Sequence, residues 1–594
     1  MSISNSEIPE AATFTSLKPS PPRFHISESA MNNLVRVAFT LAVAVKIWLV
    51  LCFAMRAGGD APEDDRLFMS LAQNIISGQW LGTYDTYTLV KCPFFPIWIA
   101  AMFYLNIPLL VSYQLLHAGA CLLLAAALRP SIPRQATRFA IFLWFLFDPV
   151  MYSYMASHVV RDAINTPMTL IILTAMIAIL TRLDRSPRSL LRWSLLLGST
   201  LAAFWTSREE AVWIVPGLLA ALGYALYIVW RCRDSALPKT MILVLPALMC
   251  AAGTVTVCAL NYVHYGVFEL SEFKSTAFKR ANGALMRVKH ESWNQYDNVP
   301  QEVRMKIYEV SPAFAELKGF LEGPPGEAWG RGAESWLEGG TPSPKDIRGG
   351  FFVWAMRQAT DVQGHYSSAI EAASYFDRIA DEINAACEDG RLECGRERSS
   401  MMPPWRNEYI PLLLDSLSQC LWNQLMLTGV EVRELESTGP INLRAIFADI
   451  GRARLTPDPT GIGATPTPPN QARLNEFRFE ILRALNSYFL KIVPVVTVCG
   501  ILAFAVTVIR ALRSRSLSPI LTINLILLVF FASRTAVLCV VTVMSFDTLK
   551  VPYITPLGPI LQLLCCLSLY HLSQNSKSAN AGRRDAAPGP NHDA

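Results

Sequence analysis

The chain has 594 residues, of which 52% are hydrophobic and only 17% are Asp, Glu, Lys or Arg. This composition excludes a disordered chain, which would be poor in apolar residues and rich in charge. The formal net charge of +5 is small and its basic residues are scattered between apolar blocks, which argues against a nucleic-acid-binding protein. Thirteen cysteines in a chain of this length do not indicate a disulfide scaffold.

Residues 1–33 are polar and rich in Pro and Ser, which predicts a disordered cytoplasmic tail, and 573–594 predict a second one. The first apolar block, 34–55, would be about 33 Å long as a helix, enough to cross a hydrocarbon core of about 30 Å. We interpret it as a membrane span, because it is longer than the core of a signal peptide. Nine further apolar blocks predict spans at 109–128, 139–156, 164–180, 190–206, 211–230, 241–262, 488–509, 519–544 and 555–572.

The block 93–105 is too short to cross, at about 18 Å as a helix, and prolines bracket it. We interpret it as a re-entrant or juxtamembrane helix. The clusters of basic residues then all fall in loops on the cytoplasmic side, in alternation with loops poor in basic residues, as the positive-inside rule requires. The sequence therefore predicts a mainly α, polytopic protein of about ten spans with both termini in the cytoplasm. The first external loop, 56–92, and the region 263–485 face outward.

The region 263–485 has no block of spanning length, which predicts a soluble, mainly helical domain inserted between membrane segments 34–262 and 486–572. Apolar residues at three-to-four spacing over 369–386 predict an amphipathic helix. An oxidising compartment would permit a disulfide between Cys387 and Cys394, although spacing alone leaves free thiols as the alternative. Five tryptophans of this domain suit core positions better than carbohydrate platforms: Trp329, Trp336, Trp354, Trp405 and Trp422.

The first external loop concentrates acids beside a span. Asp60, Glu63, Asp64 and Asp65 lie within six residues, and the apolar stripe that begins near Phe68 predicts a helix lying in the membrane interface.

This loop resembles the first external loop of GT-C glycosyltransferases, in the branch of protein O-mannosyltransferases and lipid A aminoarabinose transferases. Asp64 and Asp65 match an acidic pair that stands four residues before an aromatic residue. Phe68 occupies the aromatic position, where typical members have Tyr. Lys91 matches the later basic residue, and Cys92 departs from the pattern because it replaces the first of two prolines.

Three further motifs resemble the same family and are all predicted to face outward. Asp148 precedes a proline at the end of the third predicted span, and Arg161 with Asp162 is similar to a second acidic loop of the family. The segment 206–210 resembles a Thr-Arg-Glu-Glu motif at an outer helix junction, and 550–556 resembles an Arg-Tyr-x-x-Pro motif that opens a late span.

The resemblance implies a bacterial inner-membrane glycosyltransferase. Its donor would be a polyprenyl-phosphate-linked sugar, and its acceptor a periplasmic or lipid-linked glycan, a lipid or a protein; membrane lipids would be partners and nucleic acid would not. A carboxylate would deprotonate the acceptor, and such general-base catalysis typically raises the rate ~10²–10⁴-fold. Lys or Arg would meet the charge of the departing lipid phosphate. The catalytic candidates are Asp64, with Asp60 and Asp65 as rivals, and Asp162; the phosphate-binding candidates are Lys91, Arg161, Arg208 and Lys550.

Structural roles compete with each of these assignments. Asp64 and Asp162 also suit the N-cap of a following helix. Arg208 has two adjacent glutamates as local ion-pair partners. Lys91 and Lys550 also suit the membrane interface, where lysine side chains extend toward water. The chemistry requires no cofactor, while the acids permit a divalent cation.

Arg534 lies in the middle of a predicted span, so it requires a partner or a wet cavity. Asp148 is the structural candidate and a lipid phosphate the functional one. Two other functions stay open at this point: a lipid-linked glycan ligase or polymerase, whose key residues would lie in the large outer region, and a polytopic transporter or flippase. Internal repeats typical of transporters are not evident in the sequence.

Overall fold

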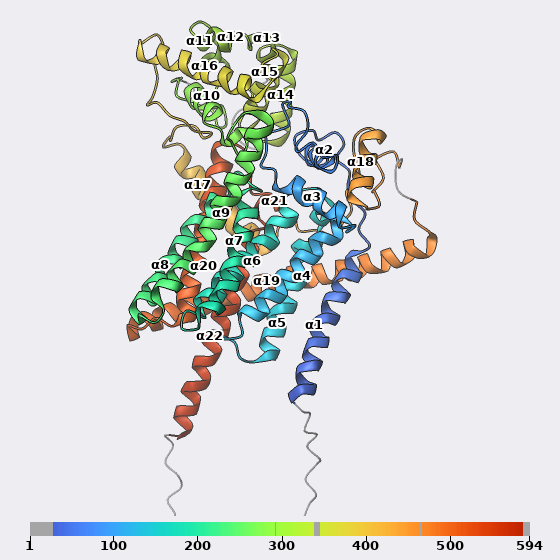
Figure 1. Ribbon diagram of the computed structural model, residues 1–594, viewed down its shortest axis with the longest axis vertical. Coiled ribbons are helices and arrows are strands. Elements are labelled where there is room, and N and C mark those ends of the chain that lie inside the picture. Colours follow the sequence, from blue (N-terminus) through green and yellow to red (C-terminus); the bar gives the residue numbers. More distant parts are fainter. Residues whose placement is uncertain (1–27, 292, 338–344, 462–465, 586–594) are drawn as a thin grey trace, which may run out of the picture.

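The computed structural model describes residues 28–291, 293–337, 345–461 and 466–585. These residues form helices joined by loops, with three isolated β-bridges. The chain folds as a polytopic α-helical membrane protein, with a bundle of long helices below a second group of shorter helices (Figure 1). Residues 1–27 of the first predicted tail and 586–594 of the second lie outside the described residues. Helix α1 begins at Glu28, and α22 continues to Asp585, so 573–585 are helical where the sequence predicted disorder.

Among the described residues, seven helical segments are long and apolar enough to cross a membrane. They are Asn33–Val50, Leu109–Ala127, Asp162–Leu180, Ala211–Cys232, Ala236–Tyr265, Pro469–Ser514 and Pro519–Met544. The bundle helices are α1 Glu28–Val50, α4 Leu109–Ala127, α5 Gln135–Leu146, α6 Asp162–Leu180, α7 Pro187–Trp205, α8 Val215–Cys232, α9 Ala236–Tyr265, α19 Pro469–Ser514, α20 Pro519–Met544 and α22 Leu557–Asp585.

Helix α6 is the central helix of the bundle, because its residues from Asp162 to Ile179 are all buried. Its sequence is apolar on every side, which is the pattern of a helix enclosed by others. It packs against α4 and α7, and it carries Asp162 at its outer end.

The predicted span 139–156 is not one helix. Helix α5 ends at Leu146, and two 3₁₀ turns follow, η1 at Pro149–Tyr152 and η2 at Tyr154–Ser157. Pro149 causes the break, because a proline disfavours the α conformation of the residue before it. The carboxylate of Asp148 accepts a hydrogen bond from the backbone N–H of Val150 and starts the turn. Of the other predicted spans outside the seven, α7 and α22 are helical at the expected positions.

The predicted first external loop, 56–92, contains the short helix α2 at Asp65–Ile76, and the predicted block 93–105 that follows forms α3 at Phe94–Tyr104. Helix α3 is short, as predicted. The apolar stripe of α2, however, is buried by protein rather than by the membrane interface. Leu67 and Leu71 pack beneath the outer domain, while Phe68 and Ala72 join the core of the bundle.

The outer domain contains helices and short turns, as predicted. They are η4 Glu272–Lys274, α10 Thr276–Met286, α11 Gln301–Tyr308, α12 Pro312–Ala315, α13 Lys318–Leu321, α14 Pro324–Trp336, α15 Phe351–Val362, α16 Ala369–Glu388, α17 Tyr409–Met426 and α18 Ile441–Gly451. Helix α16 confirms the amphipathic prediction, with Phe376, Ile379 and Ile383 buried in the domain core. Helix α19 then runs without interruption from the outer region into the bundle.

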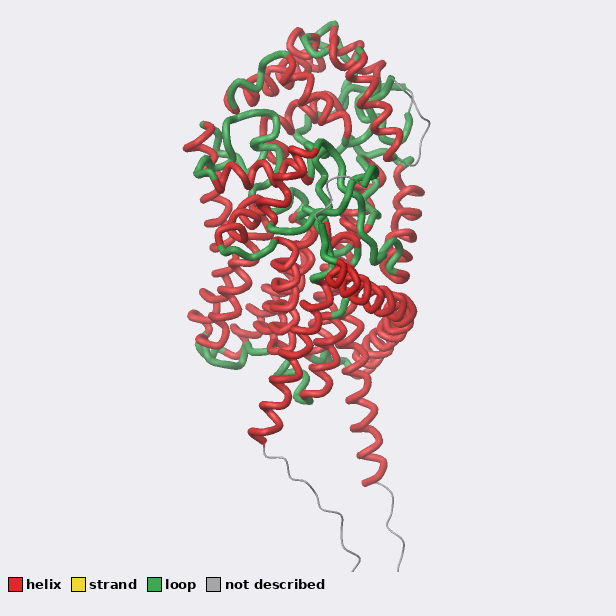
Figure 2. Tube along the Cα trace, turned by 90° about the vertical axis from the view of Figure 1, so that its right-hand side faces the viewer, coloured by secondary structure: helices red, strands yellow, loops and turns green. Residues whose placement is uncertain are grey.

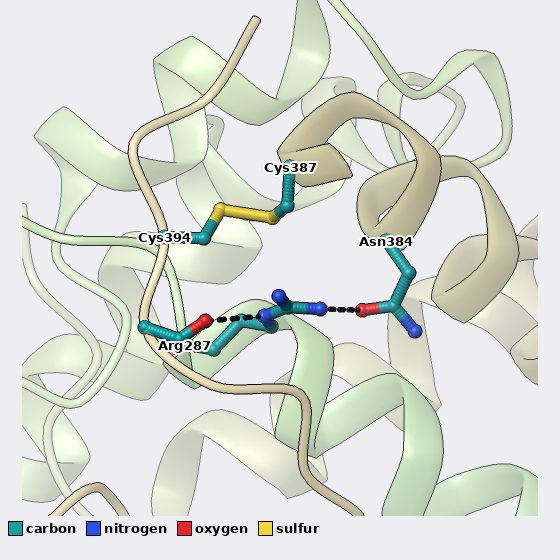
Figure 3. The surroundings of a disulfide bond; sticks show 5 residues. Arg287, Asn384, Cys387 and Cys394 are labelled. Atoms are coloured by element: carbon teal, nitrogen blue, oxygen red, sulfur yellow. Dashed lines mark hydrogen bonds between the residues drawn. A yellow bond between two sulfur atoms is a disulfide. The ribbon is translucent and has the colours of Figure 1, made fainter. Parts of the chain in front are cut away.

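Cys387 and Cys394 form a disulfide at the C-terminal end of α16 (Figure 3). Beside it, Arg287 donates to the side-chain oxygen of Asn384 at 2.7 Å and to the backbone carbonyl of Gly395 at 3.1 Å. These bonds join α10 to the loop that the disulfide closes.

The outer domain is fixed to the outer end of α20. Tyr296 donates its hydroxyl to the carbonyl of Thr542 at 2.8 Å, and Asn298 donates to that of Met544 at 3.0 Å. Both bonds satisfy carbonyls that the last turn of a helix leaves without partners. Gly349 follows the same surface so closely that a Cβ would lie 1.9 Å from the carbonyl oxygen of Ser545. Loops gather at this level, between the bundle and the outer helices (Figure 2).

Candidate functional site

Asp64 lies at the start of α2 with its side chain 63% exposed. Its carboxylate pairs with the ammonium of Lys91, which also donates to the backbone carbonyl of Glu63. Lys91 is buried, so it does not extend into water in the way predicted for an interface lysine. The position of Asp64 before α2 suggested an N-cap, but its side chain makes this ion pair and no capping hydrogen bond. The site therefore offers a carboxylate that a substrate can reach.

Unlike the exposed side chain of Asp64, the side chain of Asp65 is buried. Arg56 Nη1 donates to its Oδ2 at 3.1 Å, and Nδ1 of His158 lies 3.9 Å from the same oxygen. Burial raises the pKa of Asp65 to about 7, and Arg56 offsets only part of this effect. Burial also lowers the pKa of His158 to about 3, so the imidazole is neutral.

We expect Asp65 to make stability depend on pH. Its pKa rises from an ordinary 3.8 in the unfolded chain to about 7 in the folded protein, so unfolding releases a proton between these values. Stability must then fall as pH rises from about 4 to about 7. Asp65→Asn should flatten this decline in thermal unfolding curves of the detergent-solubilised protein. Parallel wild-type and variant profiles would show that Asp65 ionises normally.

Asp60 lies apart from Asp65, on the exposed side of the loop. Its carboxylate accepts a hydrogen bond from the hydroxyl of Thr438, in the segment before α18. This contact ties the first loop to the outer region and gives Asp60 a structural partner.

Arg161 and Arg208 form ion pairs at the outer ends of α6 and α7. Arg161 binds Glu209 at 2.8 Å, while Arg208 pairs with both Asp162 and Glu210. Asp162 therefore lies within the first turn of α6 and acts as an ion-pair partner, not as the N-cap. Burial alone would raise the pKa of Glu210, but its arginine neighbours outweigh burial and hold that pKa well below the ordinary value.

Arg534 reaches this cluster from the middle of α20. Its Nη1 lies 3.9 Å from Glu210, and its Nη2 donates to the backbone carbonyl of Tyr553 at 2.7 Å. The partner is therefore Glu210, and the prediction of Asp148 was wrong; Asp148 instead lies near Lys46 of α1. Among the described residues, Nε and Nη1 of Arg534 have no hydrogen-bond acceptor.

Two aromatic rings lie against the cationic side chains of this region. Lys91 Nζ lies 5.2 Å from the ring centre of Phe68, and the guanidinium of Arg161 lies 5.4 Å from it. The guanidinium of Arg208 lies 5.6 Å from the ring of Tyr553. We call the following ten residues the charged cluster: Arg56, Lys91, Arg161, Arg208, Arg534, Asp64, Asp65, Asp162, Glu209 and Glu210.

Asp64 lies close to Tyr553 as well. Burial raises the pKa of Tyr553, and the Asp64 carboxylate is the next largest cause. The late segment that contains Tyr553 therefore meets the first loop at the charged cluster.

A cavity lies beneath Asp162, lined by Tyr113, Gln114, Thr166 and Thr555 among others. The hydroxyl of Tyr113, Oε1 of Gln114 and Oδ1 of Asp162 have no hydrogen-bond partner among the described residues. Buried polar groups of this kind are commonly satisfied by ordered water. A second cavity shares Thr555 and continues past Asp148 to α17 and α19.

The structure places Lys550 outside the charged cluster. Its ammonium lies 3.8 Å from Asp547 and 4.7 Å from the ring centre of Trp336, and its side chain is 43% exposed. Of the eight candidate residues, the cluster brings together Asp64, Asp65, Asp162, Lys91, Arg161 and Arg208.

Sequence reasoning missed Arg56 and His158 as members or neighbours of the site, and it included Tyr553 only as part of the 550–556 motif. Arg56 is the first charged residue after the first predicted span and precedes the acids, a signal that could have singled it out. His158 carried no comparable signal, because its partner is an acid 93 positions earlier in the chain. Trp354 packs in an apolar cluster of the outer domain and also lies 5.8 Å from Lys91, so it brings the outer domain to the site. Trp336, Trp405 and Trp422, also expected in the domain core, are instead 61%, 56% and 59% exposed.

Within the described ranges, the structure has no group of three or more His, Cys, Asp or Glu that could hold a metal ion. A divalent cation shared with a substrate phosphate stays a prediction.

No protein-family model and no curated protein matches the sequence. Two crystal structures of ArnT from Cupriavidus metallidurans are similar, one in the apo state and one bound to undecaprenyl phosphate. They align with 93% and 92% of this chain and with 80% and 79% of their own chains, at 15% sequence identity. The TM-scores are 0.30 and 0.29, so neither structure establishes what this chain does.

Proposed function

We propose that the protein is a GT-C-type membrane glycosyltransferase that moves a sugar from a polyprenyl-phosphate donor to an acceptor on the external side of a bacterial inner membrane. One observation carries this proposal: the exposed carboxylate of Asp64 lies in a cluster of cationic side chains at the outer ends of the spans. A base for the acceptor and donors for a lipid phosphate are thus side by side.

In the proposed reaction, Asp64 takes the proton of the acceptor hydroxyl. The acceptor oxygen then forms a bond to the anomeric carbon, while the bond from that carbon to the phosphate oxygen breaks. The electron pair leaves with the polyprenyl phosphate. Lys91, which already contacts Asp64, lies where it can bind both the carboxylate and a phosphate oxygen.

Arg534 is the second proposed phosphate ligand. Two of its nitrogen atoms have no acceptor among the described residues, although the side chain is only 1% exposed. A buried guanidinium with donors not used by the protein is suited to a charge-assisted hydrogen bond with a phosphate. Glu210 and Asp162 hold Arg208 beside it, so the cluster keeps its charges paired before substrate binds.

The buried arginines of the outer domain argue against a ligase or polymerase whose key residues lie there. Arg304 binds Glu322 at 2.7 Å, and Arg357 binds Glu272 at 2.6 Å. Arg357 also donates to the carbonyl of Thr86, so it ties the outer domain to the first loop. These contacts support a structural role for both arginines.

A binding measurement tests the proposal. The protein in phosphatidylcholine nanodiscs should bind polyprenyl phosphate saturably, and added salt should weaken this binding because charges are recognised. The matched control is polyprenol of the same length without its phosphate, which should bind far more weakly. Equal binding of the two lipids, or of neither, would contradict the proposed donor class.

A further inference from the structure

Helix α17 presents an apolar stripe that the described part of the chain leaves uncovered. Ile410, Leu414, Leu417 and Leu421 recur at helical spacing and are 50%, 65%, 38% and 44% exposed. The neighbouring face of the helix packs inward through Tyr409, Ser416, Cys420 and Gln424. An amphipathic helix normally buries its apolar face, so this stripe requires an occupant.

The packing of α17 places it at the outer end of α20. Tyr409 packs against residues 543–544, the last two of α20. Cys420 packs against residues 538–539, about one turn further in. Figure 1 shows α17 beside α20, where the bundle meets the outer domain.

The exposed surface of α20 continues onto α17. On α20, a candidate membrane span, exposed side chains recur from Leu525 to Ala536. From Leu538 onward its residues are buried or half-buried, where α17 covers them. Helix α17 therefore covers the outer end of α20, and its exposed stripe lies beyond the part of α20 whose exposed residues would contact lipid deeper in the membrane.

We propose that α17 lies in the external membrane interface with its stripe inserted among the acyl chains of the outer leaflet. Asp415, Ser418 and Gln419 lie on the other side of its exposed arc, where they would face water or headgroups. Trp422 and Trp405 are 59% and 56% exposed. Trp422 lies on the same side of α17 as Asp415 and Ser418, where it would meet the headgroups, and tryptophan is enriched at that level of a membrane. The region 263–485 would then be anchored to the membrane surface.

The same helix α17 also lines the second cavity. Asn423 and Gln424 of α17 line that cavity, and Gln424 donates to the carbonyl of Ile554 at 2.8 Å. The helix that contacts lipid on one face thus forms a wall of an interior space on the other.

Photocrosslinking tests the proposal in the full chain. A benzoylphenylalanine is introduced at Leu414, Leu417, Asp415 or Gln419, each on the exposed arc, so the buried face stays intact. After reconstitution in phosphatidylcholine nanodiscs and illumination, adducts are identified by mass spectrometry. Leu528, exposed on the α20 span, is the positive control.

We expect lipid adducts at positions 414 and 417 and no lipid adducts at positions 415 and 419. Adducts to a second copy of the chain would show that the stripe is a protein interface and would overturn the proposal. Absence of lipid adducts at both stripe positions, while Leu528 gives them, would overturn it as well. If a variant fails size-exclusion chromatography, Ile410 replaces a stripe position and Ser418 replaces Asp415 or Gln419.

Discussion

Asp64→Asn should reduce sugar transfer by roughly 10²-fold or more, because the amide cannot accept the proton of the acceptor. The protein should fold and insert normally. Asp64 is 63% exposed, and its carboxylate contacts Lys91, from which an asparagine oxygen can still accept a hydrogen bond. The measurement is the initial rate of transfer in nanodiscs, alongside the thermal unfolding temperature of each variant.

Asp60→Asn and Asp65→Asn are the matched controls for this experiment. Asp60 contacts Thr438, and Asp65 is buried against Arg56, so neither should serve as the base. Near-normal transfer by Asp64→Asn, together with inactivity of Asp60→Asn, would identify a different acid in the same loop. Normal transfer rates in all three variants would contradict catalysis by this loop.

The helical architecture was largely predictable, because apolar runs of spanning length have few alternatives in a chain this poor in charge. Local conformation was harder to predict. The prediction for 139–156 relied on hydropathy and underestimated Pro149, which ends α5 early. The stripe of α2 was correctly read as helical, but its burial depends on the outer domain, which lies far away in sequence.

The residues of the site could be named from the sequence, but their pairing could not. Asp64 and Lys91 are 27 positions apart and meet only because the first loop folds back. The choice of Glu210 over Asp148 as the partner of Arg534 depends on which face of α20 meets η3 at Ala211–Ile214. The difference between Asp64 and Asp65, one exposed and one buried, follows from the rotation of α2.

Lys91→Met should weaken binding of polyprenyl phosphate while leaving acceptor binding nearly unchanged. A hydrogen bond to a charged group contributes ~1.5–3 kcal/mol. Its loss corresponds to a roughly 10- to 100-fold rise in Kd. Methionine keeps much of the apolar stem of lysine, so the packing against Phe68 is preserved. The exposed Asp64 can be hydrated when its partner is removed, which limits the cost to stability.

Lys289→Met is the matched control, because Lys289 is an exposed lysine of the outer domain that pairs with Glu393 at 2.7 Å. It removes the same charge far from the charged cluster, so donor affinity should stay at the wild-type value. Lys550→Met should have a smaller effect than Lys91→Met, since Lys550 faces Asp547 and Trp336. An unchanged Kd with reduced transfer in Lys91→Met would show that Lys91 positions Asp64 and does not bind the phosphate. That result would leave Arg534 as the remaining phosphate ligand, because its free donors do not depend on the Asp64 pair.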